Sequence, residues 1–215
     1  MLIETLQLGP FAANCYIYSP DGGRAVVIDP GADGAVVAAH LQALEMECIA
    51  IVNTHGHLDH IGGNRELRRL TNALIAIGAG DAAYLGPNAE PIHRQDALII
   101  GPEAVSIFQT GYEPSPAADF LLKDGDIAPG GLTVLATPGH TAGSVTLAAP
   151  GVLFVGDTLF AGAVGRWDLC GGDRDRLLAS IRTKILTRPG DTTVYPGHGP
   201  KTTVDEERRH NPFLT

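Results

Sequence analysis

The stretch THGHLDHIGG, residues Thr54–Gly63, places three histidines and an aspartate within six residues. It follows the apolar run CIAIVN and precedes the helix-like run NRELRRL, so it joins a predicted strand to a predicted helix. The glycine between His55 and His57 lets the loop turn tightly enough for both imidazoles to converge. Asp59 and His60 follow at the start of the helix. Because imidazole and carboxylate groups are common ligands of zinc and iron, the pattern predicts two neighbouring sets of metal ligands.

Three further donors occupy similar positions later in the chain. Each follows a predicted strand in a glycine-rich turn: His140 in ATPGHTAGS, Asp157 in VLFVGDTLF and His198 in TTVYPGHGP. Open α/β sheets place their sites at the carboxyl ends of strands, so these side chains are expected to gather at one edge. Buried imidazoles and carboxylates are costly unless they are paired, and a bound cation would neutralise them. The combination therefore predicts a metal site.

The pattern of apolar residues predicts an α/β fold. Runs rich in Val, Ile and Leu predict strands at residues 14–19, 25–31, 48–54, 73–80, 132–139, 144–151, 152–157 and 192–199. Apolar residues at helical spacing predict helices at residues 35–46, 64–72, 81–86 and 174–186, the last with Asp173 as its N-cap. Strands alternate with helices, and no shift in composition marks a linker, so residues 1–215 are interpreted as one domain.

Two further segments are interpreted separately. The stretch 86–119 contains five prolines and is the least regular part of the chain, which favours a lid or an oligomer contact. Just before it, GAGDAA (residues 78–83) fits a dinucleotide-loop pattern, but no second strand with an acidic end follows at the required distance. We interpret it instead as a strand-to-helix turn with Asp81 as the N-cap.

Composition excludes several classes of protein. Hydrophobic residues make up 44% and charged residues 18% of the 215 residues, which is typical of a globular protein. A formal charge of −9 without any Lys/Arg run argues against nucleic-acid binding. No apolar run approaches the ~20 residues that cross a membrane. The first residues lack the features of a signal peptide, and the cysteines are odd in number and far apart, so a cytoplasmic location is expected. Composition leaves the oligomeric state unknown.

The chain resembles the metallo-β-lactamase fold superfamily, and within it the small glyoxalase II-like hydrolases. The motifs that carry the resemblance are THGHLDH, TPGHTAGS, GDTLF, GRWDL followed by GGD, and YPGHGPKTTVDEER with the terminal NPFL. It implies an αβ/βα sandwich of two mixed β-sheets flanked by helices.

The resemblance also implies a metal for each ligand set. It places His55, His57 and His140 on one divalent ion. It places Asp59, His60 and His198 on a second, with Asp157 bridging both. Zinc is the expected metal, with iron or manganese as alternatives.

The activity implied is hydrolysis of a small-molecule thioester of the hydroxyacylglutathione type by a metal-bridging hydroxide. Asp59 would orient this nucleophile, and Arg166 would contact the substrate unless it only pairs with Asp168. Trp167 and Cys170 stand where relatives often have Thr and Pro; either residue would contact substrate or simply pack. Full-length glyoxalase II enzymes carry a further helical domain that binds glutathione, and it has no counterpart after His198, so glutathione recognition is not implied.

Two other functions remain open. One is a persulfide dioxygenase-like oxidoreductase of the same fold, in which a single Fe(II) sits on His55, His140 and Asp157. The other is a non-catalytic metal-binding or partner-binding module. The open, polar character of the predicted site argues against this module, because structural metal sites are usually closed by protein ligands.

Overall fold

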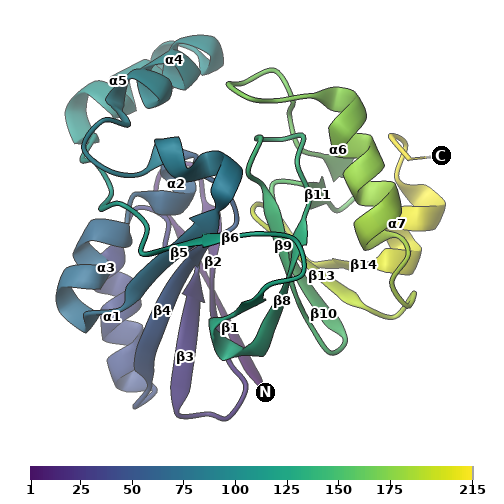
Figure 1. The fold of residues 1–215 in the computed structure, drawn as a ribbon, viewed down its shortest axis with the longest axis horizontal. Helices are drawn as coiled ribbons and strands as arrows, with labels where there is room; N and C mark the ends of the chain where they lie inside the picture. Colours follow the sequence, from purple (N-terminus) through teal and green to yellow (C-terminus); the bar gives the residue numbers. More distant parts are fainter. Residues whose placement is uncertain (215) are drawn as a thin grey trace.

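The computed structural model describes residues 1–214 and shows two mixed β-sheets packed face to face with helices outside them (Figure 1). The first sheet has the order β1-β2-β3-β4-β5-β6, with bounds Leu2–Leu8, Ala13–Ser19, Arg24–Ile28, Glu47–Asn53, Leu74–Gly78 and Phe120–Leu122. The second has the order β14-β13-β10-β9-β8-β7, with bounds Thr202–Thr203, Thr193–Pro196, Val152–Gly156, Val145–Ala149, Leu132–Ala136 and Ile127–Ala128. The strands β11 (Leu159–Phe160) and β12 (Ala163–Val164) pair with each other in an antiparallel two-stranded ribbon. The predicted sandwich is confirmed.

The central strands are buried on both faces, which explains why their sequences are continuously apolar rather than alternating. In β3, Val26 and Ile28 face the second sheet, while Ala25 and Val27 face the helices. Between the sheets lies an apolar layer that includes the fully buried ring of Phe154. This layer fixes the two sheets against each other, so side chains at their shared edge are held in a defined arrangement.

Helices cover the outer face of each sheet. In Figure 1, α1 (Gly34–Ala43) and α3 (Asn64–Thr71) lie outside the first sheet. Outside the second lie α6 (Arg174–Ser180), which continues into a short π-helical turn at Ile181–Ile185, and α7 (Val204–His210). The side chain of Asp173 accepts a hydrogen bond from the amide of Arg176 at 3.0 Å, which confirms the predicted cap of α6.

The expectation that residues 86–119 are the least regular part of the chain is wrong. The segment contains α4 (Glu90–Ile100) and α5 (Pro102–Gly111), which lie together above one end of the sandwich in Figure 1. Pro91 and Pro102 each occupy the first turn of a helix, where the missing amide hydrogen costs nothing. These prolines start helices, whereas the sequence reading took them as breaks.

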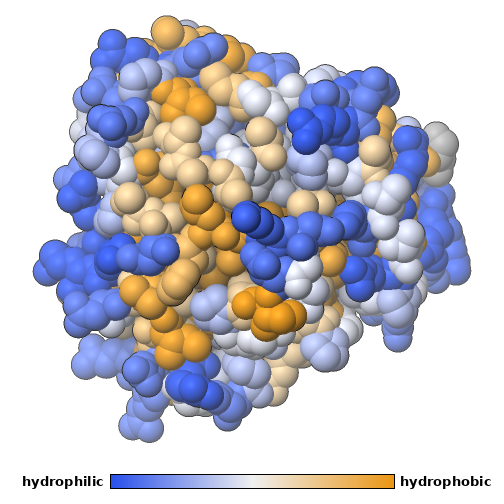
Figure 2. Space-filling model, in the orientation of Figure 1, coloured by the Kyte–Doolittle hydropathy of each residue, from blue (hydrophilic) through white to orange (hydrophobic). Residues whose placement is uncertain are grey.

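Apolar surface gathers over the middle of the face shown in Figure 2, around β6. Exposed apolar side chains in this part of the chain include Leu74, Phe120, Leu121 and Ile127. Because β6 is only three residues long, the unpaired edge that it offers to another strand is short. Within residues 1–214, no helix combines the length and the apolar character needed to span a bilayer.

The end of β5 packs closely against the turn between β8 and β9 of the second sheet. A Cβ added to Gly78 would lie 2.0 Å from the carbonyl oxygen of Gly143, in the turn between β8 and β9. Gly78→Ala should therefore lower the free energy of unfolding by about 1–3 kcal/mol, the usual cost of overpacking. Urea denaturation followed by circular dichroism measures this change.

Gly111→Ala is the matched control, because nothing lies within 4 Å of the added methyl group. It should be neutral or stabilise the protein by up to ~1 kcal/mol, since alanine favours helix. Equal stability of the Gly78→Ala variant and the wild type would contradict the close packing of the two sheets at this point.

Candidate functional site

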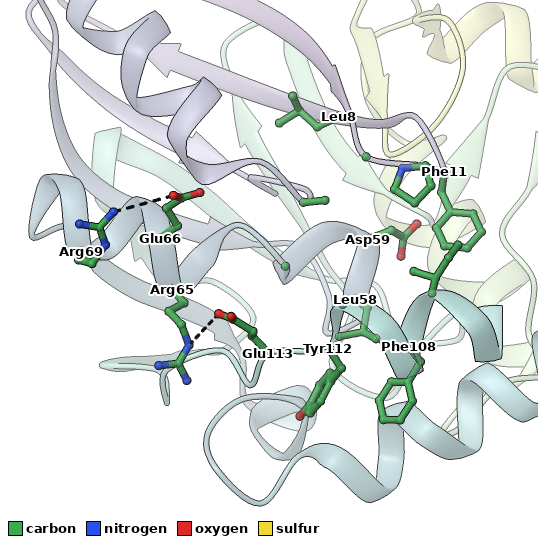
Figure 3. Close-up of a pocket in the computed structure, with 16 residues that line it drawn as sticks. Leu8, Phe11, Leu58, Asp59, Arg65, Glu66, Arg69, Phe108, Tyr112 and Glu113 are labelled. Atoms are coloured by element: carbon green, nitrogen blue, oxygen red, sulfur yellow. Dashed lines mark ion pairs between the residues drawn. The ribbon is translucent and has the colours of Figure 1, made fainter. Parts of the chain in front are cut away.

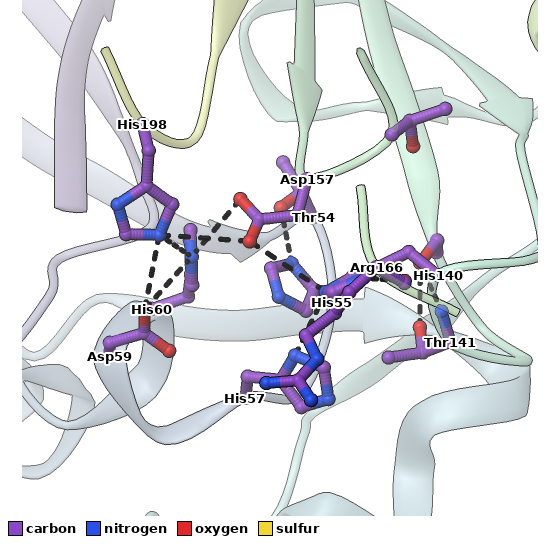
Figure 4. A network of polar contacts seen from close by, with 12 residues as sticks. Thr54, His55, His57, Asp59, His60, His140, Thr141, Asp157, Arg166 and His198 are labelled. Carbon is purple, nitrogen blue, oxygen red and sulfur yellow. Dashed lines mark hydrogen bonds and ion pairs between the residues drawn. The ribbon is translucent and has the colours of Figure 1, made fainter. Parts of the chain in front are cut away.

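The predicted donors meet at one edge of the sandwich, where strands of both sheets end. His55 and His57 follow β4, and α2 (Leu58–Ile61) begins immediately after them and carries Asp59 and His60. His140 follows β8, Asp157 follows β10 and His198 follows β13. Figure 4 shows these side chains pointing toward one another from the two halves of the molecule. The structure therefore brings together all the residues that the sequence marked as metal ligands.

The donors form two groups with Asp157 between them. In the first group, the ligand atoms of His55, His57 and His140 lie within 4.8 Å of one another, and His57 Nδ1 is 2.9 Å from His140 Nε2. In the second group, His198 Nε2 lies 3.1 Å from Asp59 Oδ2 and 3.3 Å from His60 Nε2.

Asp157 reaches both groups. Its Oδ1 lies 3.4 Å from His60 Nε2, and its Oδ2 lies 3.7 Å from His140 Nε2 and 3.6 Å from His198 Nε2.

In three of these histidines, a hydrogen bond made by Nδ1 on the outer side of the ring leaves Nε2 facing the site. His140 Nδ1 donates to the carbonyl of Arg166 at 2.7 Å, and His198 Nδ1 donates to the carbonyl of Phe11 at 3.2 Å. His60 Nδ1 lies 3.0 Å from Asp29 Oδ2, which accepts its proton. In their neutral forms, which carry one proton each, all three imidazoles would direct the lone pair of Nε2 at the site.

This arrangement fits a bound cation. Lone pairs that face one another at 2.9 to 3.3 Å repel unless a proton or a metal ion lies between them. Among residues 1–214, His55 Nε2 and Asp157 Oδ1 are buried and have no hydrogen-bond partner. Such atoms are costly unless a ligand satisfies them. The donor set also has the imidazole and carboxylate chemistry that divalent metals prefer.

The charges at the site favour a cation as well. Burial and the neighbouring imidazoles lower the pKa values of His55 and His57 well below the usual range, so both are neutral, the form that binds metal. Burial opposes the charged form of His60, but the carboxylates of Asp157, Asp59 and Asp29 outweigh it and raise its pKa to about 10. The negative field that attracts this proton would equally attract a metal ion.

Two buried aspartates hold the ligand loops in place. Asp29 accepts hydrogen bonds from the amide of Thr54 at 2.8 Å and from the hydroxyl of Thr54 at 2.6 Å, in addition to its contact with His60. Asp81 was predicted to cap a helix, but Gly78 occupies the N-cap of the 3-10 helix η1 (Ala79–Tyr84) instead. The prediction was wrong because the carboxylate of Asp81 is engaged elsewhere.

Asp81 connects the loop of the first two histidines to the turn that carries the third. It accepts hydrogen bonds from the amide of Gly56 at 2.9 Å, the hydroxyl of Thr141 at 2.7 Å and the amide of Gly143 at 2.7 Å. Gly56 itself packs against the ring of Tyr84, and an added Cβ would lie 2.3 Å from that side chain. Both features keep His57 and His140 at a fixed separation.

A cavity of about 330 Å³ opens beside the donors. Its opposite wall is apolar and comes largely from α4 and α5, through Ala97, Ile100, Ala104, Ile107 and Phe108. The segment expected to be a lid or an oligomer contact is thus a wall of the candidate site. Leu58 and Asp59 line both this cavity and a second hollow of about 430 Å³, shown in Figure 3, whose lining includes Arg65 and Arg69.

Arg166 lines the cavity and is paired with Asp168. Its Nε and Nη2 donate to the two carboxylate oxygens of Asp168 at 2.7 and 2.9 Å. Its side chain is 40% exposed, and its carbonyl orients His140. The ion pair considered from the sequence is therefore present, and Arg166 is also part of the cavity lining.

The two unusual residues of this loop have different environments. Trp167 packs against the core beneath α6, and the guanidinium of Arg174 lies 5.6 Å above its ring. Burial and the nearby carboxylate of Asp96 raise the pKa of the Cys170 thiol to about 11, so it is protonated and a weak nucleophile at neutral pH. Packing thus accounts for Trp167, and the reactivity of Cys170 is low.

Asp96 was missed by the sequence reading. It lies on α4, is buried, lines the cavity and sits beside His57. No motif surrounds it, and it belongs to the proline-rich stretch that was expected to be irregular.

Comparisons with known proteins agree with this arrangement. The model of the Metallo-beta-lactamase superfamily matches residues 8–198. The hydroxyacylglutathione hydrolase GloC of Haemophilus influenzae is 32% identical, over 100% of this chain and 98% of its own.

Among solved structures, the BLEG-1 B3 metallo-beta-lactamase is 35% identical with a TM-score of 0.86, and each chain is covered completely. TTHA1623 in a di-iron-bound form is 33% identical with a TM-score of 0.83, over 98% and 100% of the two chains. ETHE1 from Myxococcus xanthus is 27% identical with a TM-score of 0.77, over 99% and 84%.

The family model covers most of the chain, and its boundaries include every donor from His55 to His198. This chain belongs to the metallo-beta-lactamase superfamily.

Proposed function

We propose that this protein is a dinuclear metal-dependent hydrolase that cleaves thioesters of the hydroxyacylglutathione type. The observation that carries the proposal is the pair of donor groups that share Asp157 and open onto a cavity. Similarity to GloC over the full length supports the substrate class, and similarity to a di-iron protein supports two ions.

In this proposal each donor group holds one ion. His55, His57 and His140 would hold the first, Asp59, His60 and His198 would hold the second, and Asp157 would serve both. Zinc is the proposed metal, with iron or manganese as alternatives. When bound, the ions activate water as a nucleophile at neutral pH and polarise the carbonyl that is attacked.

The chain itself positions the reactants. Asp59 lines both hollows, and in this proposal its carboxylate would orient the attacking water and accept its proton. The apolar wall of α4 and α5 excludes water and holds the acyl group, while the second hollow has room for the thiol portion of the substrate. The protonated thiol of Cys170 is not required as a nucleophile.

The first prediction concerns metal content. Asp157→Ala should lose most of both ions, because its oxygens face both donor groups, whereas His198→Ala should retain the ion of the other group. Inductively coupled plasma mass spectrometry of freshly purified protein should find two ions in the wild type and about one in His198→Ala.

Asp175→Ala is the control, because Asp175 is a solvent-exposed acid on α6, and this variant should keep both ions. Circular dichroism shows whether each variant is folded. A folded Asp157→Ala protein that still holds two ions would contradict the bridging role.

A second prediction concerns the reaction. The zinc-loaded protein should release free thiol from S-D-lactoylglutathione or a simpler 2-hydroxyacyl thioester, with no oxygen consumed. A thiol reagent and an oxygen electrode measure the two quantities on the same sample. Removal of metal with a chelator should abolish thiol release, and zinc should restore it.

The competing function is a mononuclear iron dioxygenase that uses His55, His140 and Asp157. Similarity to ETHE1 is the observation behind it. Stoichiometric oxygen uptake with glutathione persulfide, without thioester turnover, would establish the dioxygenase function and rule out the proposed thioester hydrolase.

A third prediction concerns Arg166, which we propose as a substrate contact at the mouth of the cavity. Arg166→Ala should raise KM for acyl groups that bear a carboxylate by a factor of about 5, since the partly exposed guanidinium contributes about 1 kcal/mol. Neutral acyl groups should be affected much less. Steady-state assays of a matched pair of succinyl and butyryl thioesters would reveal the difference, and equal effects on both would restrict Arg166 to its pair with Asp168.

A further inference from the structure

The histidines of the site do not all face it with the same nitrogen. His60, His140 and His198 present Nε2, while their Nδ1 atoms are held from behind by Asp29 or by a backbone carbonyl. His55 follows the same pattern, with Nδ1 3.1 Å from the hydroxyl of Thr54. In each case the outer partner fixes which nitrogen carries the proton.

His57 is turned the other way. Its Nδ1 faces His140, so its Nε2 points out of the donor group. Among residues 1–214 this Nε2 is buried and has no hydrogen-bond partner, and the same is true of Asp96 Oδ2. These two atoms lie 3.8 Å apart, and the exposed fractions of the two side chains are 9% and 6%. Two unsatisfied polar atoms, one from the ligand loop and one from α4, thus face each other.

We propose that Asp96 is a positioning residue for His57. Its carboxylate accepts the proton of His57 Nε2 and keeps the lone pair of Nδ1 directed at the metal site. This inference rests on the proposed metal centre. A closure of about 1 Å between the two atoms would complete the hydrogen bond, and a cation held at Nδ1 would strengthen it by making the Nε2 proton more acidic.

The proposal gives α4 a second role besides forming the cavity wall. The helix begins just after Pro87, and its only buried carboxylate among the described residues is that of Asp96. One aspartate would then stand behind each donor group, Asp29 behind His60 and Asp96 behind His57. Carboxylates in this position orient ligand histidines and raise their basicity.

A simpler role for Asp96 is to anchor the loop after Arg166, since its Oδ1 accepts the amide of Cys170 at 2.9 Å. The substitution Asp96→Asn separates the two roles. The amide oxygen of asparagine can keep the bond to Cys170, and its NH2 group then faces the Nε2 proton of His57. Two donors would meet, which favours the other tautomer of His57 and turns a proton toward the metal site.

The tautomer of His57 in the wild-type protein is the first test. Long-range ¹H–¹⁵N correlation spectra of the zinc-loaded protein, with His57 assigned, distinguish protonation at Nε2 from protonation at Nδ1. We expect a proton at Nε2 for His57 and at Nδ1 for His140. A His57 that carries its proton at Nδ1 or binds zinc through Nε2 would overturn the proposal, and this result does not depend on any variant being folded.

Zinc affinity is the second test, measured by competition with a chromophoric chelator. Asp96→Asn should weaken binding of one of the two ions by at least about 10-fold, the effect of losing such an outer partner. Glu90→Gln on the same helix removes a negative charge from an exposed pair with Arg94 and should leave both affinities unchanged.

The outcomes separate the two proposals. A folded Asp96→Asn protein with wild-type zinc affinity would overturn the role of Asp96 and leave the metal centre standing. A wild-type protein that binds no zinc, iron or manganese would overturn the metal centre itself, and this inference with it.

Discussion

The desolvation of ionisable side chains at one edge of the sandwich is the constraint on which the rest of the structure depends. Imidazoles and carboxylates from two sheets lie together buried or half-buried, and ring nitrogens of different histidines approach to 2.9 and 3.3 Å. Such an arrangement is unfavourable unless a positive charge satisfies it. The apolar layer between the sheets and the hydrogen bonds of Asp29 and Asp81 keep the groups together despite their mutual repulsion. The same arrangement therefore bears on both the stability of the fold and the candidate metal site.

The strand ends explain how a chain can assemble these donors from distant positions. The parallel strands β3, β4 and β5 deliver their ends to one edge, and β10 and β13 do the same in the second sheet. The loops that follow these strands carry the donors. Substitutions at other positions in the same loops can therefore change which substrate fits without moving the donors. The helices α4 and α5 are inserted between β5 and β6 and supply the far wall of the cavity.

The sequence predicted the sandwich and the donors because both depend on local patterns. Strands buried on both faces appear as continuous apolar runs, and residues such as His55 and His140 lie in the loops that follow them. The helices α4 and α5 were not predicted because Pro91 and Pro102 read as breaks, although each lies in a first turn. Asp81 and Asp96 were not recognised because their roles depend on partners far away in the chain, Gly143 and His57. Short edge strands such as β7 carry too few residues to show a period.

Anomalous X-ray diffraction from crystals of the zinc-loaded protein, recorded on both sides of the zinc absorption edge, tests the central claim most directly. The claim is that the buried donors form two cation sites joined by one carboxylate. The account predicts two anomalous peaks, one among His55, His57 and His140 and the other among Asp59, His60 and His198, with Asp157 touching both. A single fully occupied peak at saturating zinc, with the second group still held by hydrogen bonds between Asp59 and His198, would contradict it.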